Sequence, residues 1–173
     1  MGWSINKLGH LDLSGCFMAH GYDMFAVEKL AREYYAAELT ELVAWDGLEI
    51  RGMTSERKFL HLIRRHGHGE PPLNALMDID LRRVECLPIL KLAVTGKLPV
   101  NVYRQEGKRG KIDKVEVVVK GLDANYIVVL GCFKDHYIVR SAYPANKTYV
   151  EKIRKNGTLI EDIRPNDNRE AMQ

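Results

Sequence analysis

The chain has few cysteines and no long apolar run, and both absences narrow its class. Cys16, Cys86 and Cys132 have spacings that fit neither paired disulfides nor a C-x-x-C metal site, which favours a reducing compartment. No stretch approaches the roughly 18 consecutive apolar residues of a membrane span, and the first residues lack the features of a signal peptide. We expect a cytoplasmic protein without a membrane partner. Origin as a fragment of a larger exported or virion protein stays open.

Basic residues are scarce in the first 50 positions of the chain. The 173 residues carry a net charge of +3 and are 46% apolar, enough to bury a core. Residues 1–50 hold three Lys or Arg against eight Asp or Glu, a net charge of −5, which leaves +8 on residues 51–173. We therefore predict an acidic helical segment, 1–50, and a basic α+β domain, 51–173. A basic body favours a polyanionic partner such as RNA, although a generically solvated surface has the same composition.

Helical patterns dominate the first 95 residues. Asp23 can cap a helix over 24–44, and Thr54 can cap a second helix that the glycines and prolines after residue 66 must end. A third helical stretch, 80–95, contains Pro88, which breaks or kinks it. Between the first two, the "LEIR" stretch is a short strand or an extended connection. A last helix is expected over 147–155.

Strand patterns follow the helices. The sequence contains four β-branched and aromatic runs joined by short turns, namely "LPVNVYR", "KVEVVVK", "NYIVVLGCF" and "HYIVRSAY". Four successive strands with short connections predict an antiparallel meander. The expected fold class is α+β, with N-terminal helices packed on one face of a C-terminal antiparallel meander of about four strands, and a short C-terminal helix.

A histidine-rich helix end, "HLIRRHGHGE" at 61–70, is the first candidate site. His66 shares a helical stripe with Phe59 and Ile63, so we expect its ring at the margin of the core, where a histidine pKa can be tuned. His68 follows in a glycine-flanked loop. The ordinary alternatives are a structural histidine at 66 and a surface histidine at 68. No carboxylate or thiolate lies nearby at ligand spacing, so no metal site is expected.

The segment "YIVRSAYP" at 137–144 is the second candidate site. Arg140, Ser141 and Tyr143 supply a permanent cation, a hydroxyl donor and a phenol within four residues, which are groups that hold a phosphate. Strand alternation places Arg140 on the opposite face from Ser141. The alternative is a structural role, with Arg140 as a charged residue on an edge strand and Tyr143 as an aromatic residue that packs in the fold.

Together these motifs, over residues 55–145, resemble the barnase, EndoU, colicin and RelE-like (BECR) nuclease group, above all its small phage-polyvalent-protein and polymorphic-toxin members. The resemblance implies a toxin or effector that cleaves RNA without a metal or cofactor and leaves cyclic phosphate ends. It implies an acid or base at His66, with His68 as a possible second one, and phosphate contacts from Arg140, Ser141 and Tyr143. The group commonly has Thr at the position of Ser141, which also supplies a hydroxyl. Residues 1–50 match no part of the pattern.

Basic residues near both motifs are the expected RNA contacts: Arg64, Arg65, Lys108, Arg109, Lys111 and Lys114. A Lys/Arg-rich turn is also a common solvated tip. The expected partners are RNA, with tRNA as one candidate, and an acidic inhibitor or immunity protein. The alternatives are a non-catalytic nucleic-acid-binding module and a host-protein-interaction module on the same fold. ADP-ribosyl transfer is a less favoured enzymatic alternative, because no glutamate is convincingly placed for that reaction.

Overall fold

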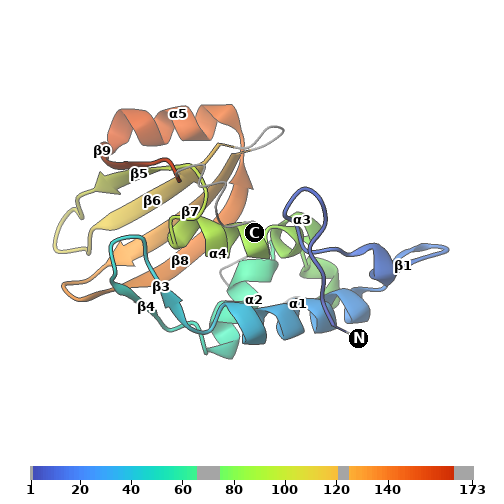
Figure 1. Cartoon of the computed structure of the whole chain (residues 1–173). Helices are drawn as coiled ribbons and strands as arrows, with labels where there is room; N and C mark the ends of the chain where they lie inside the picture. The colour runs from blue at the N-terminus through green and yellow to red at the C-terminus, as the bar shows by residue number, and fades with distance from the viewer. Residues whose placement is uncertain (1, 66–74, 121–124, 166–173) are drawn as a thin grey trace, which may run out of the picture.

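A seven-stranded mixed sheet organises the chain (Figure 1). The computed structural model describes residues 2–65, 75–120 and 125–165. The sheet strands, in spatial order, are β3 (Leu42–Val43), β4 (Glu49–Arg51), β8 (His136–Ala145), β7 (Asn125–Cys132), β6 (Lys114–Val119), β5 (Val100–Gln105) and β9 (Thr158–Ile163). The helices are α1 (Met24–Glu38), α2 (Glu56–Ile63), α3 (Leu81–Glu85), α4 (Leu87–Val94) and α5 (Lys147–Asn156), with 3-10 turns η1 (Ser14–Cys16) and η2 (Ala75–Asp78).

The predicted four-stranded antiparallel meander is wrong, although the class is α+β. The four predicted runs form β5 to β8, but β3 and β4 extend the sheet at one side and β9 at the other. In addition, β4 pairs with β8 in parallel, so the sheet is mixed. The added strands β3 and β4 have two and three residues, too few to display a period of two in the sequence.

The helices also depart from the predicted boundaries. The Asp23 side chain caps α1 as expected, accepting from the backbone N–H groups of Phe25 and Ala26, but α1 ends at Glu38 and the chain then turns into β3. Ser55, rather than Thr54, caps α2 through the N–H of Lys58. The stretch 80–95 breaks at Cys86 into α3 and α4, with Pro88 in the first turn of α4, where no N–H partner is needed.

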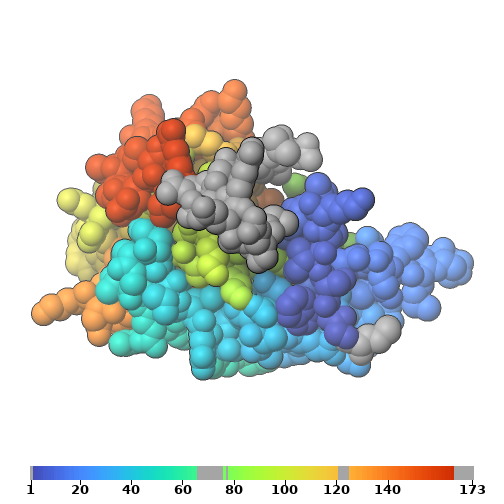
Figure 2. All heavy atoms as spheres, in the orientation of Figure 1, coloured from blue at the N-terminus to red at the C-terminus, as the bar shows by residue number. Residues whose placement is uncertain are grey.

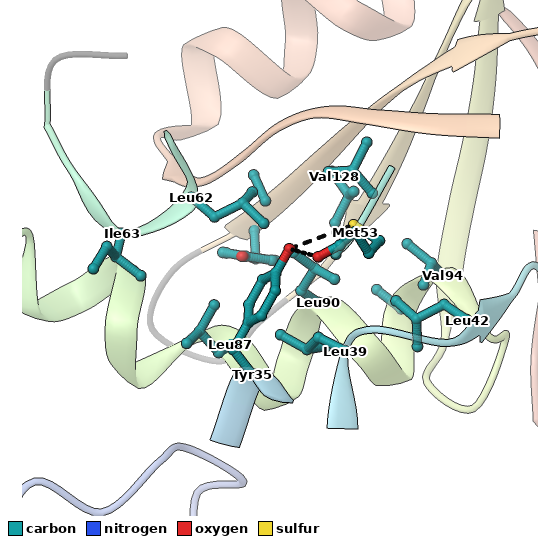
Figure 3. Packing of buried hydrophobic residues seen from close by; sticks show 14 of the residues in the cluster. Tyr35, Leu39, Leu42, Met53, Leu62, Ile63, Leu87, Leu90, Val94 and Val128 are labelled. Atoms are coloured by element: carbon teal, nitrogen blue, oxygen red, sulfur yellow. Dashed lines mark hydrogen bonds between the residues drawn. The ribbon is translucent and has the colours of Figure 1, made fainter. Parts of the chain in front are cut away.

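The main core lies between the sheet and helices α1 to α4. Figure 3 shows Leu39, which directly follows α1, Leu62 of α2 and Leu90 of α4 in one cluster with Val128 of β7. Tyr35 of α1 is buried, and its hydroxyl donates to the Met53 carbonyl over 2.6 Å, which fixes the segment between β4 and α2. Core residues therefore come from both sides of residue 50, where the sequence suggested a division.

Helix α5 packs on the opposite face of the sheet from the main core. Its Val150 and Ile153 contact Tyr103, Val118 and Ile127, which form a second, smaller cluster. The N-terminal helices and the C-terminal helix therefore lie on opposite faces of the sheet, an arrangement that the sequence did not predict. Because α5 is ten residues long and the sheet is wide, it covers only part of this face. We call this the α5 face.

The N-terminal region adds a small hairpin, β1 (Phe17–Met18) with β2 (Gly21–Tyr22), which projects from the body at the right of Figure 2. Its Phe17 and Tyr22 rings meet edge to face with centroids 5.2 Å apart. Across the described ranges, no helix is both long and apolar enough to cross a membrane.

Candidate nucleic-acid interface

A β-bulge brings Arg140 and Ser141 to the same face of the sheet. Ser141 pairs with Val129 and Val139 with the next β7 residue, Leu130, so Arg140 is the extra residue of β8. Two residues that share one partner across a bulge have side chains on one side. The prediction that alternation separates Arg140 from Ser141 is therefore wrong, and the bulge puts a guanidinium and a hydroxyl together on the α5 face.

Gly131 makes room for the Arg140 side chain. A Cβ at Gly131 would lie 3.0 Å from Nε and 3.7 Å from Cζ of Arg140. The guanidinium therefore lies over the backbone of β7, on the row of the sheet that Gly131 shares with Ile138. Arg140 itself is exposed, so its charge faces solvent.

Two further cations occupy the same row of the α5 face. Arg51 pairs with Ile138 from β4, and Lys114 pairs with Gly131 from β6. Residues in register across a sheet project to the same side, so Arg51 and Lys114 flank Arg140. Three inter-strand spacings of about 4.8 Å separate Arg51 on β4 from Lys114 on β6, so these two residues are about 14 Å apart along the backbone row. We call Arg51, Arg140 and Lys114 the cation row.

Lys114 is tied to a buried carboxylate. Its Nζ lies 3.2 Å from Oε1 of Glu116, whose side chain is 1% exposed and whose Oε2 accepts from Gln105 Nε2 over 2.8 Å. Glu116 partly neutralises Lys114 and holds its side chain in place. Within the cation row, Arg140 is accordingly the cation least offset by a neighbour.

The edge of β8 adds positive charge beside Arg140. Strand β4 ends at its pair with Ile138, and beyond that point the Lys58 ammonium of α2 donates to the Val139 carbonyl. Burial, followed by repulsion from Arg57 and Arg140, lowers the pKa of Lys58. Lys58 therefore adds positive charge next to the β8 backbone, one residue before Arg140.

Tyr143 lies on the α5 face but under α5. Its ring meets that of Tyr149 edge to face at 5.8 Å, and Arg83 of α3 lies 5.8 Å from the ring centre. Burial, with a hydrogen bond to Tyr149, raises the pKa of Tyr143. Tyr143 therefore packs α5 against the sheet, in agreement with the structural interpretation of this residue, and it lies further from the cation row than Ser141 does.

The predicted RNA-contacting residues divide into two places. Lys108, Arg109 and Lys111 are exposed in the β5–β6 turn, directly before Lys114 and at the end of the sheet where the β7–β8 turn also lies (Figure 1). Arg64 and Arg65 follow α2 and pair instead with residues 78–79 near α3. The structure puts Lys114 in the cation row and the turn directly before it in the chain, and it does not bring Arg64 or Arg65 there.

The two predicted acid–base residues, His66 and His68, lie outside the described residues, so their geometry relative to Arg140 stays a prediction. The sequence analysis overlooked Arg51, Gly131, Asp135 and His136. One signal for His136 was available, because His136, Ile138 and Arg140 alternate along one strand and so point to one face. The place of Arg51 depends on the parallel pairing of β4 with β8, which no local pattern indicates.

No group of three or more His, Cys, Asp or Glu side chains is arranged to hold a metal ion in residues 2–65, 75–120 and 125–165. Comparison with protein-family models, with curated proteins and with solved structures found no match for this chain. The residues of the α5 face are therefore the only basis for assigning its chemistry.

Proposed function

We propose that the chain is a metal-independent endoribonuclease that binds an RNA phosphate on the α5 face. The observation that carries this proposal is the bulge in β8, which puts Arg140 and Ser141 on the same face, with the Arg140 guanidinium over Gly131 and Ser141 opposite Val129. Arg51 and Lys114 extend the positive charge on either side. A guanidinium can bind two phosphate oxygens at once, and a hydroxyl can donate to a third.

The reaction would be attack of a ribose 2′-hydroxyl on the adjacent phosphorus. The O2′–P bond forms, the P–O5′ bond breaks, a base takes the 2′ proton and an acid protonates the 5′ oxygen, leaving a 2′,3′-cyclic phosphate. Arg140 would stabilise the charge on the nonbridging oxygens, and Ser141 would donate a hydrogen bond to one of them. The resemblance assigns the acid–base role to His66, and that assignment stays a prediction.

A non-catalytic RNA-binding module on the same face is the second candidate. It is favoured by the openness of the site, since Arg51 and Arg140 are both exposed. Binding needs only these cations, whereas cleavage also needs a group that moves a proton. Both candidates place the phosphate over Gly131, and they differ in whether the bound RNA is cut.

The test is incubation of the pure protein, in EDTA, with a labelled RNA and with the same sequence in which every 2′-hydroxyl is replaced by hydrogen. We expect cleavage of the RNA alone, with cyclic phosphate on the 5′ products. Intact RNA at high protein concentration would rule out the nuclease. Retained binding would then support the second candidate.

A matched pair of substitutions locates the activity. Arg140→Gln removes the guanidinium over Gly131 and should lower kcat by roughly 10²–10³-fold, the usual effect of losing a donor to a developing oxyanion. Arg164→Gln is the control, because Arg164 is exposed, directly follows the edge strand β9 and pairs with Asp162. Equal activity of the two variants would remove Arg140 from the site.

A further inference from the structure

His136, the first residue of β8, lies on the α5 face with one ring nitrogen fixed. Its Nδ1 is 2.7 Å from Oδ1 of Asp135, the last residue of the β7–β8 turn. The ring stacks on Phe133 with centroids 4.7 Å apart and planes 5° apart. The side chain is 16% exposed. A carboxylate and an aromatic ring therefore hold the imidazole in one orientation.

The hydrogen bonds indicate which nitrogen carries the proton in the neutral ring. Nδ1 lies 2.7 Å from the Asp135 carboxylate and 3.3 Å from Nη1 of Arg51. The shorter contact needs a proton on Nδ1, because a carboxylate only accepts. Nε2 then keeps its lone pair, and it makes no hydrogen bond to any residue that the structure describes. An imidazole held this way can take a proton at Nε2 and return it.

Arg51 holds the Asp135 carboxylate from the next strand. Its Nε donates to Glu49 Oε2 over 2.9 Å, and its Nη2 lies 3.4 Å from Asp135 Oδ2. The hydrogen bond to His136, followed by the charge of Arg51, lowers the pKa of Asp135, so this carboxylate stays ionised at neutral pH. The result is a chain of contacts from Glu49 through Arg51 and Asp135 to the imidazole.

His136 is one row away from the Arg140 guanidinium. Arg140 lies over Gly131, in the row of Ile138, and His136 precedes Ile138 by two residues on the same face. Two residues of strand advance about 6.6 Å, so the row of His136 lies about 6.6 Å from the row over which the guanidinium lies. A phosphate bound to Arg140 would therefore lie within about one row of the imidazole.

We infer that Asp135 and His136 form an acid–base pair of the α5 face, with Arg51 as its positioning residue. This inference rests on the proposed function. In the transfer step the 2′-hydroxyl gives its proton to Nε2 as the O2′–P bond forms, and solvent protonates the 5′ oxygen as the P–O5′ bond breaks. Asp135 stabilises the imidazolium that results. His66 is not required for this step.

Two replacements of His136 separate proton transfer from structure. His136→Asn keeps an N–H near the position of Nδ1, so the bond to Asp135 can persist while Nε2 is lost. His136→Ala leaves a hole that added imidazole can fill. We expect both to lower kcat by roughly 10²–10⁴-fold with RNA affinity nearly unchanged, and we expect imidazole to restore cleavage in His136→Ala. His20→Ala, at the tip of the β1–β2 hairpin, is the matched control and should cleave at the wild-type rate.

The dependence of kcat on pH distinguishes a catalytic His136 from a purely structural one. The charged groups around the imidazole are Asp135, Arg51, Glu49 on the paired strand, and Arg140 one row away. For a wild-type enzyme that uses Nε2 as a base, kcat falls at acid pH as the ring is protonated. This acid limb should be absent from the residual activity of His136→Asn.

The outcomes separate this inference from the proposed function. If the wild-type protein does not cleave RNA in EDTA, the proposed function fails and this inference fails with it. If the wild type cleaves and His136→Asn keeps the wild-type rate and acid limb, the inference is wrong while the nuclease stands. Loss of activity in His66→Ala in that same experiment would return the acid–base role to His66.

Discussion

Arg140 owes its position to one extra residue in β8 and to the missing side chain of Gly131. The bulge turns Arg140 to the same face as Ser141, and the glycine lets the guanidinium lie close to the backbone of β7. Gly131 has no left-handed backbone conformation, so the close approach of Arg140, rather than the turn chemistry of glycine, explains this residue. Sequence alternation alone predicted the opposite arrangement.

The close approach of Arg140 to Gly131 can be tested by adding a methyl group at Gly131. Gly131→Ala places a Cβ 3.0 Å from Arg140 Nε, so the guanidinium must move by a few tenths of an ångström or more. Part of a charge-assisted hydrogen bond to phosphate is then lost, and RNA affinity should fall by roughly five-fold, measured by fluorescence anisotropy. Gly15→Ala is the control, since no atom lies within 4 Å of a Cβ built there. Equal affinities of the two variants would mean that phosphate does not bind over Gly131.

At the scale of elements, strands with strong local patterns were predictable and their partners were not. The runs of β5 to β8 have enough β-branched and aromatic residues to be recognised, and the turns between them are short. Strand β4, of three residues, takes its direction from a non-local parallel pairing with β8. That pairing is what brings Arg51 beside His136, and no property of the "LEIR" stretch alone reveals it.

The contact between α1 and α2 gives a prediction about pH. Arg32 of α1 donates to both carboxylate oxygens of Glu56 over 2.8 and 2.6 Å, and its guanidinium lies 4.5 Å from the centre of the Phe59 ring. The hydrogen bond from Arg32 lowers the pKa of Glu56 below its usual 4.5. A carboxyl group with a lowered folded-state pKa stabilises the fold above its unfolded pKa, and this contribution is lost as pH falls through the folded-state pKa.

We therefore expect Arg32→Met to lower the free energy of unfolding at pH 7 by no more than about 1 kcal/mol, because the pair is exposed to solvent. Urea unfolding at a series of pH values should show this difference constant above pH 4.5 and shrinking at lower pH. A difference that stayed constant down to pH 2 would mean that Arg32 acts through Phe59 alone. Arg57→Met, on the same helix as Glu56, is a control that should show no such pH dependence.

For the whole molecule, the arrangement of the helices and of the candidate site differs from the one that the sequence predicted. The sequence predicted N-terminal helices on one face of a meander, and a site formed by the end of the second helix together with the segment 137–144. Instead α1 to α4 and α5 cover opposite faces, and the cation row lies on the α5 face. Arg140 and Ser141 could be chosen from their chemistry alone. Their joint placement with Arg51, Lys114 and His136 could not, because it depends on register and on a bulge.

The most direct test of the central claim is a map of where RNA binds. We would titrate the 15N-labelled protein with a short RNA whose 2′-hydroxyls are methylated, so that it binds without being cleaved, and follow the backbone amide shifts. We expect the largest changes at Gly131, Ile138, Arg140 and Ser141, and little change at Ala31 and Leu90 in the main core. Changes confined to the β1–β2 hairpin or to the main-core side of the sheet, or no changes at all, would contradict the central claim.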